Sequence, residues 1–449
     1  MVTMNTAKTQ TIDLLTGEAV PKRDIYDTSH DALLSALAAW GQPSYRAAQI
    51  MRWLYRELVT DFSEMTNLPL ELRSLLDAAF TIGSAQLVAQ KISSDGWTRK
   101  ALLKMRDGNT IEAVLMLYYG RATVCISSQV GCAMGCTFCA TGQMGFTRNL
   151  SAGEIIEQVL WFNRWLREHP HVSKLPRSQR PRYEGAPVRH GAAQDAGTRS
   201  HDSTQDKTQR DENAWFGTNE AHTQDAAQKI TSVTNIVFMG MGEPLVNYNN
   251  LWAAIRMLTS TQGVGMSARR LTVSTVGVAP QIRRFAHEEQ PVNLAVSLHA
   301  PNDELRSSMM PLNTRYPVAE LVAACRDYLN TTHRRITFEY VLINGVNDTL
   351  PMAHELASLL KGMLCHVNLI PLNPVPGTGM KATPRQQVYA FQKIIEDAGI
   401  STTVRIERGV DIAAACGQLK VEEEPGARHR SLNPELVRAH VQANLASTS

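Results

Sequence analysis

Residues 131–139 read Gly-Cys-Ala-Met-Gly-Cys-Thr-Phe-Cys and place Cys132, Cys136 and Cys139 in a Cys-x3-Cys-x2-Cys spacing. Three thiols this close together in the chain indicate a metal site. A structural zinc site would use a second Cys-x2-Cys unit or nearby histidines, and the sequence around the trio offers neither. A [4Fe–4S] cluster is normally held by four thiolates, so three cysteines would leave one iron open to another ligand.

The same spacing, with the aromatic Phe138 before the last cysteine, resembles the signature of radical S-adenosylmethionine (SAM) enzymes. The resemblance implies a [4Fe–4S] cluster that binds SAM at its open iron. Gly142 and Gly145 follow the trio and would let the backbone wrap closely around such a cluster.

The bulk composition is that of a globular protein with two or three domains. The chain has 449 residues, of which 43% are hydrophobic and 19% charged, and its formal net charge is +3. This mild positive charge permits an RNA partner without requiring one. No apolar run approaches the roughly 20 residues that cross a bilayer, and the first residues lack a signal-peptide core. We therefore predict a cytoplasmic protein that does not enter a membrane.

Alternating strand and helix patterns dominate the chain after residue 121 and predict a parallel α/β sheet. Strands are predicted over 122–130, 234–241, 269–277, 292–300, 334–343, 366–374 and 401–407. Helices are predicted over 151–168, 249–260, 278–289, 317–330, 351–363 and 384–399. Six or seven such units predict a barrel or open partial barrel, with its active site at the carboxyl ends of the strands.

The chain divides into four segments, and the third of them contains an insertion. Residues 97–105 and 110–119 form strand patterns around Asp107-Gly108, a favourable hairpin turn. Residues 176–229 contain almost no large aliphatic side chains and predict a disordered insertion. The predicted segments are a helical accessory domain for RNA binding over 1–90, a connecting hairpin over 91–120, a partial barrel over 121–424 that includes the insertion, and a tail over 425–449.

Polar and glycine residues follow four of the predicted strands, where a ligand would bind. A carboxylate such as Glu243 could accept a hydrogen bond from the amino group of SAM, and glycines allow close approach. Each residue by itself is equally compatible with a turn or a structural hydrogen bond. The polar and glycine candidates are Gly242, Glu243, Ser274, Ser297, His299 and Asn373, and the apolar Leu298 lies between Ser297 and His299.

Two cysteines outside the trio also stand out. Cys125 lies in the first predicted strand of the barrel, and Cys416 lies in the loop sequence Ala-Cys-Gly. Each by itself is best interpreted as an inert buried thiol. Gly417 after Cys416 makes that cysteine the better candidate for a nucleophile.

Six motifs together resemble the RlmN/Cfr family of radical SAM RNA methyltransferases, and the resemblance covers nearly the whole chain outside 176–229. The motifs are VCISSQVGCAMGCTFCATGQMGF (124–146), FMGMGEPL (238–245), LTVSTVGVAP (271–280), SLHAPND (297–303), NLIPLNPVPG (368–377) and DIAAACGQL (411–419). The resemblance implies a partial (α6β6) radical SAM barrel with an N-terminal helical domain. It also implies methylation of carbon 2 of adenosine in 23S rRNA and tRNA.

The resemblance further implies roles for individual residues. Cys132, Cys136 and Cys139 match the cluster ligands, and the strand-end candidates above match positions that bind SAM. Cys416 matches a cysteine that carries the methyl group as S-methylcysteine, Cys125 matches its partner in a transient disulfide, and Glu112 matches a proton acceptor. A flavodoxin-type electron donor and a monomeric enzyme are further expectations.

Three other functions remain open at this point. A Cfr-type enzyme would methylate carbon 8 of adenine with nearly the same residues. A radical SAM enzyme acting on a protein would keep the fold, although the pair Cys125 and Cys416 argues against it. A non-catalytic iron–sulfur module that binds RNA would use the trio without cleaving SAM.

Overall fold

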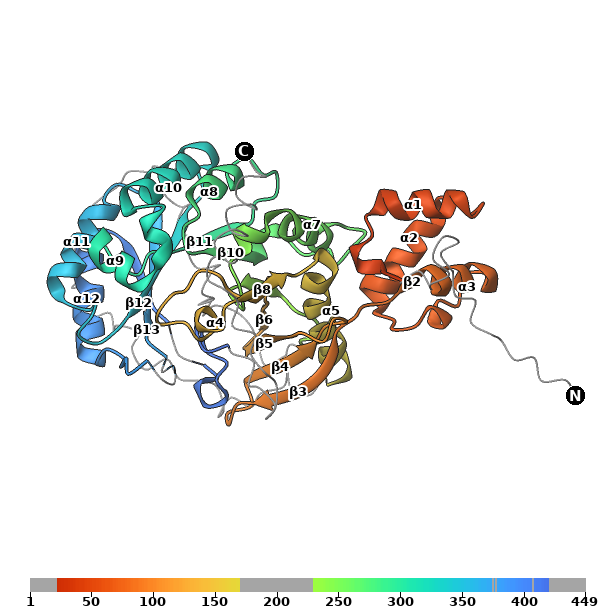
Figure 1. Cartoon of the computed structure of the whole chain (residues 1–449), viewed down its shortest axis with the longest axis horizontal. Helices are drawn as coiled ribbons and strands as arrows, with labels where there is room; N and C mark the ends of the chain where they lie inside the picture. The colour runs from red at the N-terminus through yellow and green to blue at the C-terminus, as the bar shows by residue number, and fades with distance from the viewer. Residues whose placement is uncertain (1–21, 170–228, 374, 376–377, 406–407, 420–449) are drawn as a thin grey trace, which may run out of the picture.

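The computed structural model shows a curved sheet lined by helices, with a smaller helical part beside it (Figure 1). It describes residues 22–169, 229–373, 375, 378–405 and 408–419. The predicted tail and all but Lys229 of the predicted insertion lie outside these residues. Among the described residues, no helix is long and apolar enough to span a bilayer.

Ten strands form one sheet in the order β14-β13-β12-β11-β10-β9-β6-β5-β4-β3. All pairings from β6 to β14 are parallel, which confirms the predicted α/β fold. No pairing between β3 and β14 joins the described edges, so the sheet is an open partial barrel. The parallel strands are β6 (Arg121–Cys125), β9 (Asn235–Phe238), β10 (Leu271–Thr275), β11 (Asn293–Ser297), β12 (Ile336–Leu342), β13 (Cys365–Pro371) and β14 (Ser401–Val404).

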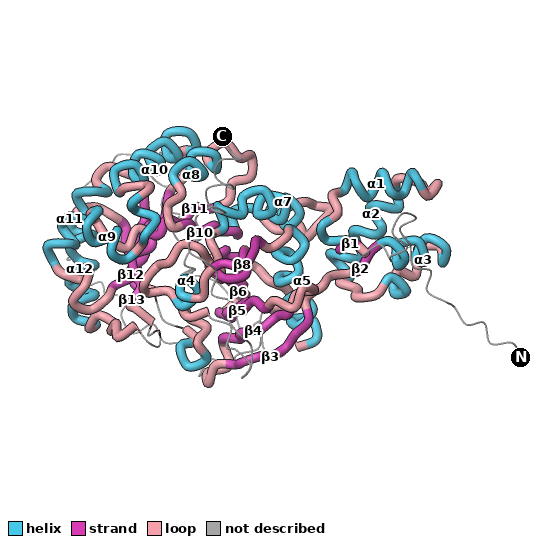
Figure 2. Tube along the Cα trace, viewed as in Figure 1, coloured by secondary structure: helices cyan, strands magenta, loops and turns pink. Residues whose placement is uncertain are grey.

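Helices cover the outer face of the parallel strands (Figure 2). They are α5 (Ala152–Glu168), α7 (Tyr248–Thr259), α8 (Ala279–Phe285), α10 (Val318–Thr332), α11 (Leu350–Leu360) and α12 (Arg385–Asp397). The short helix α9 (Asp303–Met309) instead lies at the carboxyl ends of β10 and β11. The start of α5 is set by a capping box: Ser151 Oγ accepts a bond from the Glu154 N–H, and Glu154 accepts one from the Ser151 N–H.

The predicted hairpin is part of the same sheet rather than a separate connection. Strands β4 (Thr98–Lys104) and β5 (Thr110–Tyr118) pair with each other, and β5 continues the barrel by pairing antiparallel with β6. A third strand, β3 (Gln86–Ile92), adds to the edge and was not expected from the sequence. Its pairing is interrupted by a bulge between Leu87 and Ala89.

A small helical part precedes the sheet. It consists of β1 (Arg23–Asp24), α1 (His30–Ala39), α2 (Tyr45–Arg52), α3 (Leu70–Ala79) and β2 (Phe80–Thr81). Its buried side chains include Leu37, Ile50 and Leu72. Arg164 of α5 fastens it to the barrel by donating to the Leu58 carbonyl at 3.0 Å and the Tyr26 hydroxyl at 3.1 Å.

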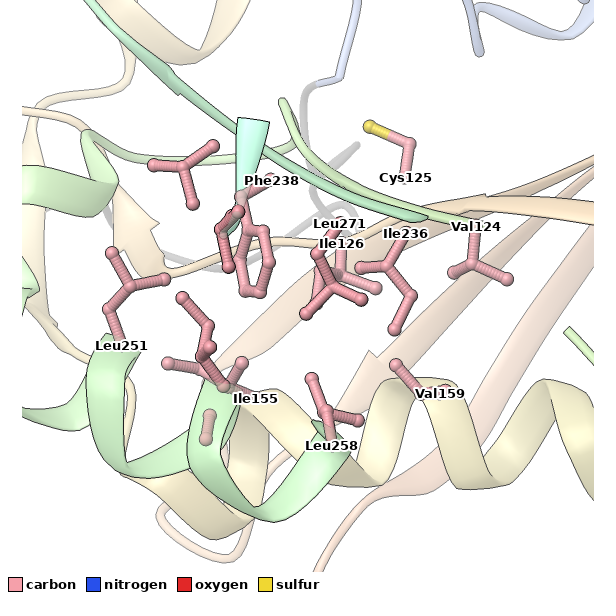
Figure 3. Packing of buried hydrophobic residues seen from close by; sticks show 14 of the residues in the cluster. Val124, Cys125, Ile126, Ile155, Val159, Ile236, Phe238, Leu251, Leu258 and Leu271 are labelled. Carbon is pink, nitrogen blue, oxygen red and sulfur yellow. The ribbon is translucent and has the colours of Figure 1, made fainter. Parts of the chain in front are cut away.

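Successive side chains of β6 and the residue after it point alternately to the hydrophobic core under the helices and to the barrel interior. Val124 and Ile126 point toward α5 and α7, where they pack among residues such as Ile155 and Val159 (Figure 3). Cys125 points to the opposite side of the strand (Figure 3). This alternation, with a period of two residues, aims the Cys125 sulfur into the barrel.

Candidate active site

The cysteine trio lies on a loop whose ends are held together. This loop joins β7 (Gln129–Gly131) to the short helix α4 (Ala140–Gln143) and the strand β8 (Phe146–Asn149). The Cys132 N–H donates to the Gly145 carbonyl at 2.7 Å. Gly131 has a φ of +75°, and a Cβ there would stand 2.0 Å from the Gly145 oxygen. Only glycine allows this crossing, which brings the cysteines together.

The three thiols pack within one group of buried, mostly apolar side chains. Cys132 and Cys136 are buried with Met309 and Leu372, and Cys139 packs against the same cluster. Burial raises the pKa of all three thiols, and each experiences repulsion from at least one other cysteine. Bound iron would compensate the negative charge of three neighbouring thiolates, so this donor set suits a cluster.

Three thiols on one loop match the donor atoms that a [4Fe–4S] cluster takes from a protein. Among the described residues, no group of three His, Cys, Asp or Glu side chains could hold one metal ion. A four-iron cluster binds each thiolate at a different iron, so its ligands lie farther apart than those of one tetrahedral ion. The three cysteines could therefore hold a [4Fe–4S] cluster.

Glu243 lies near the cysteine trio at the end of β9. Its side chain is buried, and its carboxylate accepts bonds from the Leu245 N–H at 3.0 Å and the Val276 N–H at 2.8 Å. Burial raises the pKa of Glu243 to about 7, against the opposing effect of these bonds. Gly242, with a φ of +99°, lets the chain turn closely over Gln129. The carboxylate is thus fixed in position near the cysteine loop.

His299 lies opposite, at the end of β11. Its Nδ1 accepts a bond from the Val341 N–H at 3.0 Å, and its ring meets Phe138 of the cysteine loop edge-on at 5.0 Å. Burial, with a smaller contribution from Arg306, lowers the pKa of His299 to about 3, so the ring is neutral. A neutral His299 therefore fixes its ring by a hydrogen bond to the backbone and packs against the cysteine loop.

Arg306 is a site residue that sequence reasoning missed. It is fully buried, and its guanidinium donates to the carbonyls of Val276, Ser297 and Leu298 at 2.6–3.1 Å. Burial lowers its pKa to about 10, so it stays charged at neutral pH. Arg306 thereby fixes the ends of β10 and β11, where Ser274 and the candidates Ser297 and Leu298 lie.

Asn373, after β13, has an open hydrogen-bonding position. Its Nδ2 donates to the Cys416 carbonyl at 3.2 Å, whereas its Oδ1 is buried and finds no hydrogen-bond partner among the described residues. A buried acceptor without a partner costs free energy that a donating ligand would recover. Asn373 therefore suits a polar ligand such as SAM.

Cys125 and Cys416 are brought together although they lie far apart in the sequence. Both line one cavity of about 30 Å³, together with Asn373, Arg405 and Arg408. The Cys416 loop also contacts the cysteine loop, because the Ala140 N–H donates to the Gly417 carbonyl at 2.7 Å. The cavity and the cysteine loop are thus neighbours.

The comparisons with known proteins agree with this geometry. Residues 23–82 match the family model "Ribosomal RNA large subunit methyltransferase N-terminal domain", and residues 212–357 match the radical SAM superfamily. A "probable dual-specificity RNA methyltransferase RlmN" of Roseiflexus sp. (strain RS-1) is 46% identical over 88% of this chain and 96% of its own length. This chain belongs to the RlmN family.

Further matches support the same assignment. An RlmN relative from Geobacillus thermodenitrificans is 41% identical over 91% of this chain and 96% of its own length. A crystal structure of a radical SAM methyltransferase from Sphaerobacter thermophilus is 45% identical, with a TM-score of 0.74 over 89% of this chain and 100% of that one. The chain is thus a SAM-dependent RNA methyltransferase, and its cofactors are a [4Fe–4S] cluster and SAM.

The superfamily match begins after the cysteine trio, so it covers β9 to β12 and not the loop itself. The assignment of individual ligands in this RlmN chain therefore depends on the local geometry of residues 132–139.

Glu112, which the family resemblance singled out, forms a buried ion pair in this RlmN chain. Its carboxylate lies 2.9 Å from Lys100 Nζ, and both side chains are at most 5% exposed. Lys100 also donates to the Ala413 carbonyl at 3.0 Å, three residues before Cys416. Lys100 thus connects Glu112 with the Cys416 loop, a role that no sequence motif indicated.

Proposed function

We propose that this chain methylates carbon 2 of adenosine in 23S rRNA and tRNA through a methyl group carried on Cys416. The observation that carries the proposal is the shared cavity of Cys125 and Cys416 next to the cysteine loop. Two thiols held together in this way can carry a group on one sulfur and release it by forming a disulfide.

The proposed cofactor roles are supported by the position of the candidate residues on the cysteine loop and at the strand ends. Cys132, Cys136 and Cys139 would hold the cluster, and Gly242, Glu243, Ser274, Ser297, Leu298, His299 and Asn373 would contact SAM. When bound, the cluster and SAM supply one-electron cleavage of SAM, which is the source of the radical needed to activate a methyl group. Buried apolar side chains such as Met309 and Leu372 would exclude water from this chemistry.

The protein's own groups carry the remaining steps. Carbon 2 of adenine is electrophilic, so it does not accept a methyl cation from SAM directly. The Cys416 thiolate would instead take a methyl group by displacement, and this group, once activated, would form the new bond to carbon 2. Glu112 would accept the proton from carbon 2, and the electron left unpaired on the ring would pass to an electron acceptor, a role that the oxidised cluster could fill.

Cys125 would then release the product. Its thiolate would attack the Cys416 sulfur, forming a disulfide as the bond between that sulfur and the transferred carbon breaks. The electron pair of the broken bond stays with the carbon, which takes up a proton to complete the methyl group. An external electron donor of the flavodoxin type would reduce the disulfide and return both cysteines to thiols. The enzyme would act in the cytoplasm as a monomer.

Nucleoside mass spectrometry of RNA from cells with and without this chain tests the proposal. We expect 2-methyladenosine to disappear from both 23S rRNA and tRNA when the chain is absent, and to return with the intact gene. Loss of 8-methyladenosine instead would assign the carbon-8 reaction. Unchanged 2-methyladenosine in both RNAs would contradict the proposal.

A further inference from the structure

Arg405 places a positive charge next to both cysteines of the cavity. Its Nη1 donates to the Cys416 sulfur at 3.7 Å, and Arg405 lines the same cavity as Cys125. Burial alone would lower the pKa of Arg405, but Cys416 foremost, then Glu339 and also Cys125, raise it above its ordinary value. The guanidinium therefore interacts with both sulfurs.

The position of Arg405 is fixed from two sides. It directly follows β14, and its N–H donates to the Leu369 carbonyl of β13 at 2.8 Å. On the barrel side it interacts with the buried carboxylate of Glu339, which Asn368 Nδ2 holds at 2.8 Å. A charge held in this way needs no rearrangement when a negative charge develops beside it.

Both cysteines need such a charge for the reactions proposed above. The thiolate, not the thiol, is the attacking form of cysteine. Burial raises the pKa of Cys125 to about 12, and Arg405 is the cation that opposes this effect. Without Arg405, burial would disfavour the thiolate of Cys125, which is the form that must attack the Cys416 sulfur.

We propose that Arg405 is a catalytic counter-ion that binds the thiolate of Cys416 during methyl uptake and then the thiolate of Cys125 during product release. This inference depends on the proposed function for the roles of the two cysteines. The order follows from charge: once Cys416 is methylated its sulfur is neutral, so the guanidinium is available to Cys125. An arginine suits this role because its planar fork offers several donors at once.

Arg408 provides a matched control in the same segment. It lines the same cavity, but its guanidinium lies over the Tyr118 ring at 4.4 Å and donates to the Leu117 carbonyl at 3.3 Å. Within the described part of the chain, Arg408 makes no hydrogen bond to either cavity sulfur. Removing the charge of Arg408 therefore tests whether any cation near the cavity stabilises the two thiolates, or only Arg405.

The experiment follows thiol–disulfide exchange in the cluster-loaded protein with glutathione disulfide at one fixed pH. The Cys416 thiolate attacks glutathione disulfide and releases one glutathione thiolate, and the Cys125 thiolate then attacks the Cys416 sulfur and releases a second. Acid quenching, alkylation and mass spectrometry give the rate of each step. In a Cys125→Ala background the reaction stops at the mixed disulfide on Cys416, which isolates the first step.

We expect Arg405→Gln to slow both steps by at least about tenfold, because it removes the hydrogen bond to the Cys416 sulfur and the positive charge that acts on Cys125. Arg405→Lys should restore part of the rate, and Arg408→Gln should slow both steps clearly less than Arg405→Gln does. Iron content and the thermal unfolding midpoint of each variant verify that the fold is kept.

Two results would overturn the inference. One is an unchanged exchange rate in Arg405→Gln. The other is equal slowing by Arg405→Gln and Arg405→Lys, which would assign Arg405 to packing rather than to charge. The assay contains neither SAM nor RNA, so a failure of the proposed methylation would leave its result intact.

Discussion

At the scale of single residues, Cys416 is held by one contact to its sulfur and two contacts to the backbone around it. Asn373 binds its carbonyl, Arg405 contacts its sulfur, and Gly417 is tied to Ala140 of the cysteine loop. These contacts come from three different segments, so the sulfur has a defined place between the cysteine loop and Cys125. Such positioning is what covalent catalysis by a cysteine requires.

Replacing Cys416 should abolish methyl transfer. Cys416→Ala removes the only atom that could carry the group in the proposed route, so we expect at least about a thousandfold loss of 2-methyladenosine formation in vitro. The iron content should stay that of the unsubstituted protein, because the trio is unchanged. Formation of 2-methyladenosine by Cys416→Ala at the normal rate would disprove the covalent route.

Replacing Cys125 should stop the reaction one step later. Cys125→Ala leaves Cys416 able to take up the methyl group and attack RNA, but removes the thiol that breaks the linkage. We expect a covalent protein–RNA complex that accumulates and can be detected on a denaturing gel. Cys325→Ala, which removes a fully buried thiol of α10, serves as the control and should give no complex. Clean product release by Cys125→Ala would refute the role of this thiol.

Lys100 should matter for stability as well as for position. Lys100→Met leaves Glu112 buried without its cation, and we expect a loss of about 3–5 kcal/mol in the free energy of unfolding. The pair Lys100→Met with Glu112→Gln should recover most of this loss, since it removes the uncompensated charge. Urea denaturation measures the free energy of unfolding of the single and the double variant.

Lys393→Met is the control for this substitution. Lys393 pairs with Asp397 at 3.0 Å, but both side chains are more than 60% exposed. An exposed pair contributes about 0–1 kcal/mol. Equal destabilisation by Lys100→Met and Lys393→Met would show that burial of the Lys100 pair has no energetic consequence.

At the scale of elements, the cysteine loop depends on a contact between two glycines. Gly131→Ala would place a Cβ 2.0 Å from the Gly145 carbonyl oxygen, so the loop would have to open. We expect this variant to retain well under half of the iron of the unsubstituted protein after reconstitution. Iron analysis and the visible absorbance of the cluster measure the effect.

Gly362→Ala is the matched control for Gly131→Ala. Gly362 has a φ of +76°, nearly that of Gly131, but a Cβ there would meet nothing within 4 Å. It shares the backbone strain without the steric overlap, so its cluster content should stay normal. Equal iron loss in both variants would attribute the effect to backbone strain alone.

Sequence patterns predicted the elements of this protein better than the contacts between them. All seven parallel strands and the hairpin were predicted, because buried strands carry long apolar runs bounded by turns. Strand β3 was missed because six of its seven residues are exposed, which removes the alternation that marks a strand. Lys100 and Arg306 were missed because their partners depend on strand register and on long-range folding, which no local pattern encodes.

At the scale of the whole molecule, the helical part meets the barrel around the buried carboxyl of Asp24. Its Oδ1 accepts bonds from the N–H groups of Tyr26 and Gly83, and Glu157 of α5 lies nearby. Burial raises the pKa of Asp24 to about 7, with Glu157 adding to the increase. The ionised form of Asp24 is therefore disfavoured in the folded protein.

This shift predicts a pH dependence of stability. Because the folded pKa is raised, the contribution of Asp24 is full below its ordinary pKa of 3.8 and is lost as the pH rises through about 7. Asp24→Asn should be more stable than the unsubstituted protein by roughly 1–3 kcal/mol above pH 8 and differ little near pH 4. Measuring the free energy of unfolding of both proteins at pH 4 and above pH 8 tests this prediction. A difference independent of pH would contradict the assignment.

The edge strand β3 affects the tendency of the protein to aggregate. Leu87, Val88 and Ile92 are about half exposed on the outermost described strand, which is a combination that invites another chain to extend the sheet. The bulge between Leu87 and Ala89 and the exposed Lys91 interrupt the regular ladder that such pairing needs. The irregularity of β3 thus acts as protection against aggregation through the sheet edge.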